Sequence, residues 1–360
     1  MKTVGMITIY RKNYGAFLQA YALQKTLIKL GFSPEIIRYD YYKDHSILGV
    51  SLKSKSSVLR VLKSILVEII RYIPHKKRQA VFNESVENNL IESQGYYKSY
   101  AKLKKNPPRY DVFLTGSDQV FNGMLAPQAL PARLLAFVKH GKKASYAASA
   151  GGSDFEQSSR DYIVSNLRSF DNVSVREESL AQTLVDKYQI GSCCNIDPVF
   201  LLDKEEWGRF SKKIDALNGK YIFFYRVLPQ PELLDIAERV SKEYNIPIFV
   251  ADGHAQFSKQ ITYKGILSPE QWVYAINNAE IVVTNSFHGT AFAINLKKNA
   301  YVTIPPKGGE RVRSLLRKCS LLIDRNGEVK SSNCSKVYES SECYIESEKK
   351  HSFDFLKTIG

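Results

Sequence analysis

The sequence predicts an α/β protein made of two Rossmann-like domains, each built on a parallel sheet, that face each other across a cleft. Three observations lead to this fold class. Short apolar runs of strand length alternate with amphipathic helical stretches, which is the pattern of parallel sheets covered by helices. The alternation occurs in two series with a polar segment between them. The chain of 360 residues is also longer than one hydrophobic core usually supports.

The first series opens with a strand, a helix and a second strand. The strand TVGMITIY (3–10) leads through the loop RKNYGA into the helix FLQAYALQKTLIKLG (17–31), and the strand SPEIIRYDY (33–41) follows. Gly31 ends the helix because glycine readily adopts the left-handed conformation found there. Further strands are expected at YDVFLTGS, KASYAAS and NVSVRE, and helices at SSRDYIVSNLRSF and SLAQTLVDKYQIG.

The second series begins near Gly219 and repeats the same alternation. Its expected order is strand YIFFYRVL, helix PELLDIAERVSKEY, strand IPIFVADG, helix SPEQWVYAINNAE, strand IVVTNS, helix TAFAINLKK and strand AYVTIP. The polar segment LDKEEWGRFSKKIDALNG separates the two series. We therefore predict an N-terminal domain over 1–203, a C-terminal domain over 204–325, and a tail over 326–360 that returns to the N-terminal domain. Two such domains across a cleft are the architecture called GT-B-like.

The net charge of +15 is concentrated in one region. Residues 51–110 hold 13 Lys or Arg and 4 Asp or Glu, which accounts for +9 of the excess. Within this region the stretch SVLRVLKSILVEIIRYI has apolar residues at helical spacing and is flanked by lysines and by HKKR. The sequence therefore predicts a basic amphipathic helix inside an insert of about residues 51–109.

Three interpretations of this helix stay open. A basic amphipathic helix can lie in the headgroup region of an anionic membrane, which would give peripheral membrane contact through residues 52–78. It can equally pack on the protein's own core and leave its basic face in water. Nucleic-acid binding is a third interpretation, but the sequence holds no recognised nucleic-acid motif, so we expect no nucleic-acid partner.

Other features of the sequence argue against several classes of protein. No stretch approaches the roughly 20 uninterrupted apolar residues of a membrane-spanning helix. The N-terminus MKTVGMITIY has a strand pattern without the apolar region and cleavage site of a signal peptide, so we expect a cytoplasmic protein. The 5 cysteines, without CxxC spacing, predict neither a disulfide framework nor structural zinc. HxxxH, GxGxxG and Walker patterns are missing, so we expect no metal and no bound cofactor.

Polar clusters follow several of the expected strands. They are Asp118 after DVFLT, Arg176 with Glu177 after NVS, His288 after IVVT, and Asn13, Tyr14 and Gly15 after MITIY. A glycine loop, PPKGGERVR, leads into a helix that carries Arg311 and Arg313. Ligands of parallel sheets collect at the carboxyl ends of the strands, so we expect these clusters to form one interdomain site.

Each cluster also has a structural interpretation. Asp118 can cap a helix, and Arg176 with Glu177 can be a surface ion pair worth less than about 1 kcal/mol. Gly15 can simply permit a tight turn, the glycine loop can be an ordinary surface loop, and His288 can be a hydrogen-bonding residue at a helix start. What favours a functional His288 is its position, because backbone N–H groups at a helix start attract anions and imidazole ordinarily titrates near neutral pH. The residues predict a metal-free reaction on an anionic substrate.

Seven segments resemble, in collinear order, the polysaccharide pyruvyl transferase family. They are NYGAFLQAYALQKTL, YDVFLTGSDQVFN, SYAAS, VSVREESL, DPVFLL, IVVTNSFHGTAFAINLKK and RVRSLLRKCSLLIDR. The resemblance runs from about residue 3 to about 325 and omits the basic insert and the tail. It implies a GT-B-like fold and transfer of pyruvate from phosphoenolpyruvate onto a sugar, usually as a ketal bridging two hydroxyls. Such sugars belong to bacterial capsules, exopolysaccharides or cell-wall polymers, often while lipid-linked at the inner face of the cytoplasmic membrane.

The family's motifs map onto individual residues of this chain. Its His-Gly motif corresponds to His288 and Gly289, and its Arg-Asp/Glu pair to Arg176 and Glu177. Some members carry an arginine two residues before the histidine, where this chain has Ser286. Another arginine must then hold the anionic donor, and the expected substitutes are Arg176, Arg226, Arg311 and Arg313.

These correspondences lead to a set of expected roles. His288 is the main acid/base, and Asp118 is a second base or an anchor for the acceptor hydroxyl. The donor-binding residues are Arg176, Ser286, Gly289, Arg311 and Arg313, and the acceptor-binding residues are Asn13, Tyr14 and Gly15. Two other functions remain open: a nucleotide-sugar glycosyltransferase on the same fold, and a membrane-associated binding subunit without activity.

Overall fold

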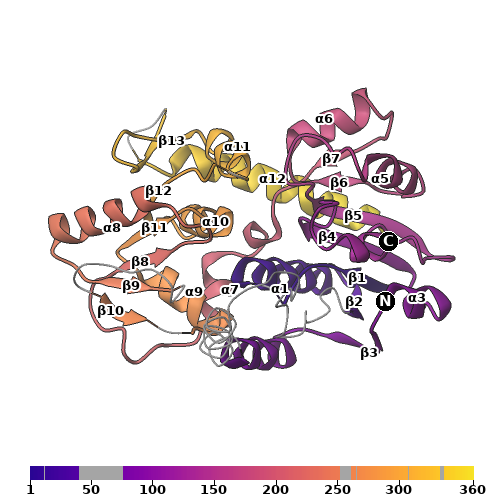
Figure 1. Ribbon diagram of the computed structural model, residues 1–360, viewed down its shortest axis with the longest axis horizontal. Coiled ribbons are helices and arrows are strands. Elements are labelled where there is room, and N and C mark those ends of the chain that lie inside the picture. Colours follow the sequence, from indigo (N-terminus) through magenta and orange to yellow (C-terminus); the bar gives the residue numbers. More distant parts are fainter. Residues whose placement is uncertain (12, 40–75, 252–260, 265, 307, 333–335) are drawn as a thin grey trace, which may run out of the picture.

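The computed structural model describes residues 1–11, 13–39, 76–251, 261–264, 266–306, 308–332 and 336–360. Within these residues the chain forms two parallel sheets with helices around them (Figure 1). The expectation of an α/β fold with two parallel sheets is confirmed. The expected amphipathic helix over 57–73 lies outside the described residues, as do residues 52–75 of the segment expected at the membrane.

The N-terminal sheet has seven parallel strands in the order β3-β2-β1-β4-β5-β6-β7. The strands are β1 (Thr3–Ile7), β2 (Ser33–Tyr39), β3 (Glu92–Tyr97), β4 (Val112–Asp118), β5 (Lys142–Ala148), β6 (Ser174–Val175) and β7 (Cys193–Cys194). The central strand β4 is buried along its whole length, as expected for a parallel strand covered on both faces. After β1 the chain adds strands on one side and then, from β4, on the other. The switch point between β1 and β4 is where such sheets bind ligands.

Helices of the N-terminal half cover both faces of this sheet (Figure 1). They are α1 (Tyr14–Lys29), a helix over 76–89, α3 (Tyr100–Lys105), η1 (Pro127–Ala129), α4 (Leu130–Arg133), α5 (Arg160–Leu167), α6 (Glu178–Asp186) and η2 (Pro198–Phe200). Asn13 begins α1, since its side chain accepts a hydrogen bond from the N–H of Ala16 at 2.9 Å. The helix over 76–89, β3 and α3 all fall in the predicted insert, so much of that insert belongs to the domain rather than lying outside it.

The C-terminal sheet has five parallel strands in the order β10-β9-β8-β11-β12. They are β8 (Ile222–Tyr225), β9 (Ile248–Val250), β10 (Ile261–Lys264), β11 (Ile281–Thr284) and β12 (Asn299–Val302). The surrounding helices are α7 (Lys204–Phe210), α8 (Pro231–Tyr244), α9 (Pro269–Asn278), α10 (Phe287–Asn295) and α11 (Glu310–Lys318). The switch point of this sheet lies between β8 and β11, and α10 begins at Phe287 rather than at the expected Thr290. His288 is therefore in the first turn of a helix.

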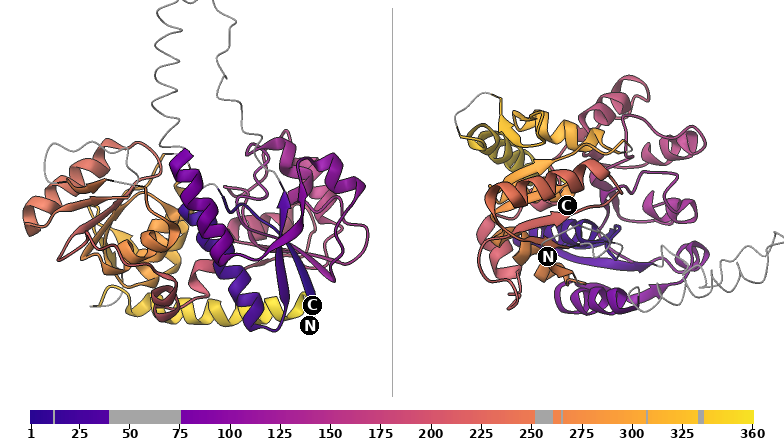
Figure 2. Two further views of the ribbon diagram at one scale, coloured as in Figure 1. Left: turned by 90° about the horizontal axis from the view of Figure 1, so that it is seen from below. Right: turned by 60° about the vertical axis from the view of Figure 1, so that its left-hand side comes forward.

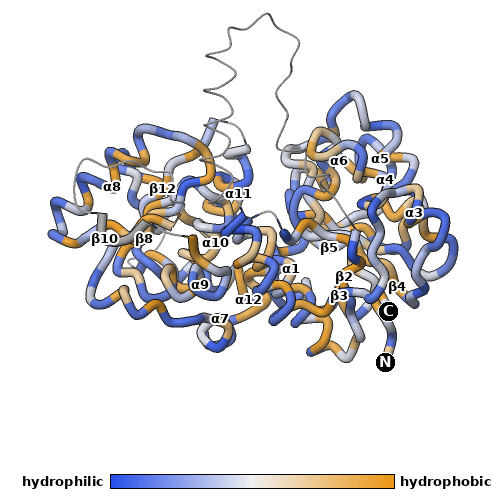
Figure 3. The backbone as a smooth tube through the Cα atoms, turned by 60° about the horizontal axis from the view of Figure 1, so that its bottom comes forward, coloured by the Kyte–Doolittle hydropathy of each residue, from blue (hydrophilic) through white to orange (hydrophobic). Residues whose placement is uncertain are grey.

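The apolar residues lie along the strands and the inward faces of the helices, and the loops are hydrophilic (Figure 3). One core cluster crosses the boundary between the halves, because residues of α1 pack against residues of α7 and α9. Tyr14 of α1 stacks on Trp272 of α9 with ring centroids 5.8 Å apart, and Tyr21 packs against Phe210 of α7 at 4.4 Å. This contact fixes how the two switch points face each other.

The chain ends in a small hairpin and a long helix. The antiparallel strands β13 (Leu321–Ile323) and β14 (Val329–Ser331) precede α12 (Glu339–Thr358), which runs along both halves of the molecule (Figure 2). Ser352 of α12 accepts a hydrogen bond from Asn195 at 3.2 Å, and Phe355 lies 6.2 Å from the ring of Tyr146. The tail thus contacts the N-terminal sheet. Among the described residues we find no helix with the length and apolar character needed to cross a membrane.

Candidate active site

His288 is held at the N-terminus of α10, directly after the buried strand β11. Ser286 caps the helix, because its hydroxyl accepts a hydrogen bond from the N–H of Gly289 at 3.3 Å. Gly289 packs against the end of β11, and a Cβ atom there would lie 2.4 Å from Oγ1 of Thr284. A side chain at this position would push the helix away from the strand. The sequence Ser286-Phe287-His288-Gly289 therefore fixes the position of the His288 imidazole at the start of the helix.

Gly15 is the second residue of α1 and touches His288 from the other half of the molecule. A Cβ atom on Gly15 would lie 2.1 Å from Nδ1 and 2.4 Å from Cγ of His288, which no real contact allows. Only glycine lets the α1 backbone come this close to the ring. Gly15, which we expected to bind the acceptor, lies against the imidazole of His288, whose side chain is 10% exposed.

Asp197 links His288 to Arg176. Nη1 of Arg176 donates a hydrogen bond to Oδ2 of Asp197 at 2.7 Å, and Nε2 of His288 lies 3.7 Å from the same oxygen. The other carboxylate oxygen accepts from the N–H of Val199 at 3.1 Å and so starts η2. Asp197 is 1% exposed in its side chain. A buried carboxylate with fixed orientation therefore holds the guanidinium by a hydrogen bond and lies next to the imidazole.

The charges of this cluster shift the pKa values of its members. Burial raises the pKa of the Asp197 carboxyl, but His288 and Arg176 beside it outweigh burial and hold that pKa below its usual range. Burial lowers the pKa of Arg176, but the carboxylates of Asp197, Glu177 and Asp118 outweigh it and raise the pKa. For Arg311, burial and the nearby Arg176 lower the pKa. The two guanidinium groups therefore lie close together among the carboxylates of Asp118, Glu177 and Asp197.

Arg176 and Arg311 approach the same two groups. Nη2 of Arg176 lies 3.9 Å and Nη1 of Arg311 lies 4.0 Å from Oδ1 of Asp118. Both guanidinium groups also lie over the ring of Phe287, at 4.5 Å and 5.8 Å. Asp118 ends β4 with a φ of 65°, a left-handed conformation that non-glycine residues rarely adopt and that is enriched at functional sites. It caps no helix, because a turn follows it.

Several buried donors of the cluster have no hydrogen-bond partner within the described part of the chain. These atoms are Nε and Nη2 of Arg176, Nε of Arg311 and Nε2 of His288. Buried polar atoms are normally hydrogen-bonded, so unpaired donors at one place indicate a site for a ligand. Oε2 of Glu177 in the same cluster is a buried acceptor without a partner among the described residues. The unpaired atoms of Arg176 and Arg311 belong to guanidinium groups, so an oxyanion is a ligand that would supply the acceptors they lack.

A cavity of about 550 Å³ lies between the two switch points. Its polar and charged lining residues are Asn13, Arg78, Asp118, Gln119, Arg226, Asn285, Ser286, His288 and Arg311. Asn13 and Asp118 follow neighbouring strands of one sheet, and Arg226 and His288 follow neighbouring strands of the other. The cavity has the volume of a typical small-molecule site.

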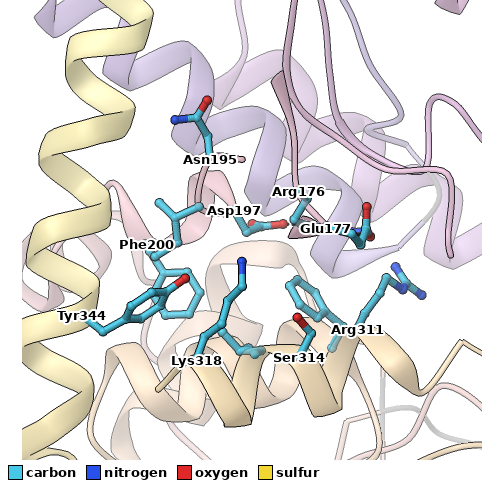
Figure 4. A pocket seen from close by; sticks show the side chains of 12 residues that line it. Arg176, Glu177, Asn195, Asp197, Phe200, Arg311, Ser314, Lys318 and Tyr344 are labelled. Atoms are coloured by element: carbon cyan, nitrogen blue, oxygen red, sulfur yellow. Dashed lines mark hydrogen bonds and ion pairs between the residues drawn. The ribbon is translucent and has the colours of Figure 1, made fainter. Parts of the chain in front are cut away.

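A second cavity of about 40 Å³ lies behind Phe287 and is shown in Figure 4. Arg311, Ser314 and Lys318 project into it from α11, and Arg176 and Asp197 face them from the N-terminal half. Nζ of Lys318 lies 3.8 Å from Glu178, so its charge is partly compensated. Arg311 and Phe287 line both cavities and form the partition between them.

Two of the expected site residues do not line the cavity. Tyr14 is 2% exposed and donates its hydroxyl to the carbonyl of Leu267 at 3.1 Å, so it is part of the interdomain core and not an acceptor contact. The side chain of Arg313 is 64% exposed and lies 3.9 Å from Glu310. Arg311 and Arg313 are two positions apart on a helix, and such positions face different directions. Only one of them can reach the site.

The structure also adds residues that the sequence reasoning missed. Asp197 stands in the segment DPVFLL, where an Asp before Pro follows a strand, and this pattern could have suggested it. Phe287, the ring that Arg176 and Arg311 share, adjoins the predicted histidine. Arg78 comes from the region read only as a basic helix. No group of three His, Cys, Asp or Glu side chains that could hold a metal occurs in the ranges that the structure describes.

Comparison with known proteins identifies the fold first. A protein from Listeria monocytogenes described as a UDP-N-acetylglucosamine 2-epimerase is 10% identical, with a TM-score of 0.51 and coverage of 99% of this chain and 91% of its own. S. aureus MnaA, in a structure with UDP, is 13% identical, with a TM-score of 0.50 and coverage of 98% and 91%. At these identities the similarity establishes the GT-B-like fold alone. No curated protein matches the chain in sequence.

The family follows from a second comparison. The model of the family described as polysaccharide pyruvyl transferase matches residues 13–304 of the 360. The match contains Gly15, Asp118, Arg176, Asp197 and His288, all of which lie at the interdomain site. This chain belongs to the polysaccharide pyruvyl transferase family.

Proposed function

We propose that this chain transfers the pyruvate of phosphoenolpyruvate onto a sugar of a bacterial surface polysaccharide or of its lipid-linked precursor, forming a ketal. The observation that carries the proposal is the set of buried donors without hydrogen-bond partners, in the part of the chain described, on His288 and Arg311, which line the interdomain cavity, and on Arg176 beside them. Family membership supplies the reaction class.

The donor fits the positive side of the cavity. Phosphoenolpyruvate carries a carboxylate and a phosphate, and guanidinium groups bind both in a bidentate manner. Arg311 lines the cavity, and Arg176, which does not line it, approaches the same Phe287 ring and the same Asp118 carboxylate. The first-turn N–H groups of α10 add the positive end of a helix dipole next to His288. These groups replace the arginine that some family members carry at the position of Ser286.

The chemistry needs one proton added to carbon and one bond to phosphate broken. His288 protonates the methylene carbon of phosphoenolpyruvate, which becomes the methyl group, and C2 gains oxocarbenium character. One sugar hydroxyl adds to C2 and loses its proton to the enzyme, which restores the imidazolium. The C2–O bond to phosphate then breaks, and a second hydroxyl closes the ketal while its proton leaves with the phosphate. Such acid/base catalysis contributes about 100- to 10,000-fold in rate.

Asp118 and Asp197 have different roles in this scheme. Asp118 lines the cavity and can accept the proton of an attacking hydroxyl or orient that hydroxyl. Asp197 is buried and contacts Arg176 and His288 instead, so we assign it as a positioning residue. A carboxylate beside an imidazole stabilises the protonated form and fixes the ring. Asn13 also lines the cavity and can contact the acceptor sugar, although its side chain caps α1.

The membrane-bound form of the acceptor gives the basic segment 52–78 a role. A lipid-linked sugar is presented at an anionic membrane surface, and a basic segment increases the local concentration of the enzyme there. Cosedimentation with vesicles of phosphatidylglycerol and of phosphatidylcholine tests this. Binding to both kinds of vesicle alike, or to neither, would argue against it.

The central experiment is a transfer assay with labelled phosphoenolpyruvate and a bacterial lipid-linked oligosaccharide fraction. We expect His288→Ala to lower turnover at least 100-fold while it leaves the fold intact, and His140→Ala, at an exposed position, to have no effect. Wild-type turnover in His288→Ala would refute the assigned role. Thermal stabilisation by UDP- or GDP-sugars without any by phosphoenolpyruvate would show a glycosyltransferase instead.

A further inference from the structure

The helix over 76–89 contacts both halves of the molecule and lies beside α1 and α9 (Figure 1). Its Asn83 accepts a hydrogen bond from Nη1 of Arg11 at 2.7 Å. Ser85 and Asn89 donate to the carboxylate of Glu270 in α9, at 2.8 Å and 2.6 Å. Residues 76–89 are thus hydrogen-bonded to both halves, so a cavity-lining side chain on this stretch has a defined position.

Arg78 is that side chain. It lines the large cavity, and its guanidinium lies 5.4 Å from the ring of Tyr14 and 5.5 Å from the ring of Phe82. A guanidinium stacked on aromatic rings keeps the N–H groups along its edge free for a ligand. Arg78 forms no ion pair with a carboxylate in the part of the chain that the structure describes.

The charge of Arg78 is additional to what the donor requires. In the proposed function the carboxylate and phosphate of the donor are bound by Arg311, His288 and the N-terminus of α10, with Arg176 beside them. Among the described residues lining the cavity, Asp118 is the one carboxylate, and it lies within 4.0 Å of Arg311 and Arg176. Tyr14, which lies under Arg78, adjoins Gly15, which touches His288. Arg78 therefore reaches the cavity next to the reacting groups but from a different element.

We propose that Arg78 binds an anionic group of the acceptor, a phosphate ester or a carboxylate, and so selects an acidic acceptor. This inference rests on the proposed function, because it assigns the donor to the other arginines. The volume of about 550 Å³ leaves room for a sugar and a charged group beside the three-carbon donor. A planar guanidinium binds either oxyanion through two parallel hydrogen bonds.

The test measures binding of two probes, inorganic pyrophosphate and glucuronate, by calorimetry and thermal unfolding with saturating phosphoenolpyruvate. We expect at least one probe to bind the wild-type chain and Arg78→Gln to weaken it about tenfold or more, the loss that one charge-assisted hydrogen bond gives. Arg78→Lys should recover part of the affinity. Lys77→Gln removes the same charge from an exposed neighbour on the same helix and should leave the affinity unchanged.

The outcomes separate this proposal from the one before it. Binding of pyrophosphate alone indicates a phosphorylated acceptor, and binding of glucuronate alone indicates an acidic sugar. The proposal is overturned if neither probe binds the wild-type chain, if Arg78→Gln binds both as tightly as wild type, or if the variant loses affinity for phosphoenolpyruvate. If phosphoenolpyruvate itself fails to bind the wild-type chain, the proposed function fails, and the probe titrations without it still decide whether Arg78 holds an anion.

Discussion

Replacing Gly15 by alanine tests whether the α1 backbone sets the position of His288. The new methyl group would lie 2.1 Å from Nδ1, 2.4 Å from Cγ and 2.8 Å from Cε1 of the ring. Atoms in contact lie about 3.5 Å apart, so the ring must move by more than about 1 Å. The ring cannot move far away from Gly15 together with its helix, because Gly289 packs the start of α10 against Thr284. A displacement of about 1 Å at a reacting group can lower the rate about 100-fold.

The effect of Gly15→Ala on folding should be much smaller than its effect on catalysis. Overpacking costs about 1–3 kcal/mol, and alanine in a helix recovers about 0.5–1 kcal/mol of that relative to glycine. We therefore expect a net loss of at most about 2.5 kcal/mol in the free energy of unfolding by urea. The turnover number, measured as phosphate release from phosphoenolpyruvate, should fall about 100-fold. The imidazole resonance of His288 in the NMR spectrum should shift.

A matched glycine provides the control for this experiment. Gly208 lies in the helix α7, and a Cβ atom there would meet nothing within 4 Å. Gly208→Ala should therefore keep wild-type turnover and the wild-type imidazole signal. If Gly15→Ala also turned over like the wild type, the reasoning that connects α1 to the imidazole would be refuted.

Two further predictions concern Asp197 and the arginines of α11. Asp197→Asn removes the charge that faces the buried Arg176, and breaking a buried pair in this way costs about 3–5 kcal/mol in the free energy of unfolding. Because the folded-state pKa of Asp197 lies below its unfolded value of about 3.9, its stabilisation is present above that pH and is lost as the pH falls through the folded pKa. Urea unfolding between pH 6 and pH 2 should show a steeper loss of stability below about pH 4 in the wild type than in Asp197→Asn, and parallel curves would contradict this. Arg311→Lys should raise the KM for phosphoenolpyruvate about tenfold or more, because a bidentate contact is lost. Arg313→Lys, at the exposed position, should leave this KM unchanged. Equal effects of the two substitutions in steady-state kinetics would contradict the assignment of Arg311 to the donor.

The sequence by itself determined most strands and helices of the two sheets and the local setting of the main site residue. It did not predict the helix over 76–89, β3, α3 or α7. Periodicity gave the alternating strands and helices, because the spacing of apolar residues depends on which faces of an element are buried. The position of His288 between a buried strand and a helix could also be predicted. Ser286 caps the helix, and Gly289 lets the helix pack closely on the end of the strand. These features depend on neighbours a few positions apart, so a single sequence contains them.

The partners of His288 were decided by the tertiary structure. Gly15, Asp197 and Arg176 come from segments far apart in the chain, and they meet because α1 packs on the C-terminal half and because both switch points face one cavity. The same packing moved Tyr14 into the core and brought Arg78 to the cavity. Which strand ends lie opposite each other follows from strand order and domain packing, and these depend on long-range burial that local spacing does not encode.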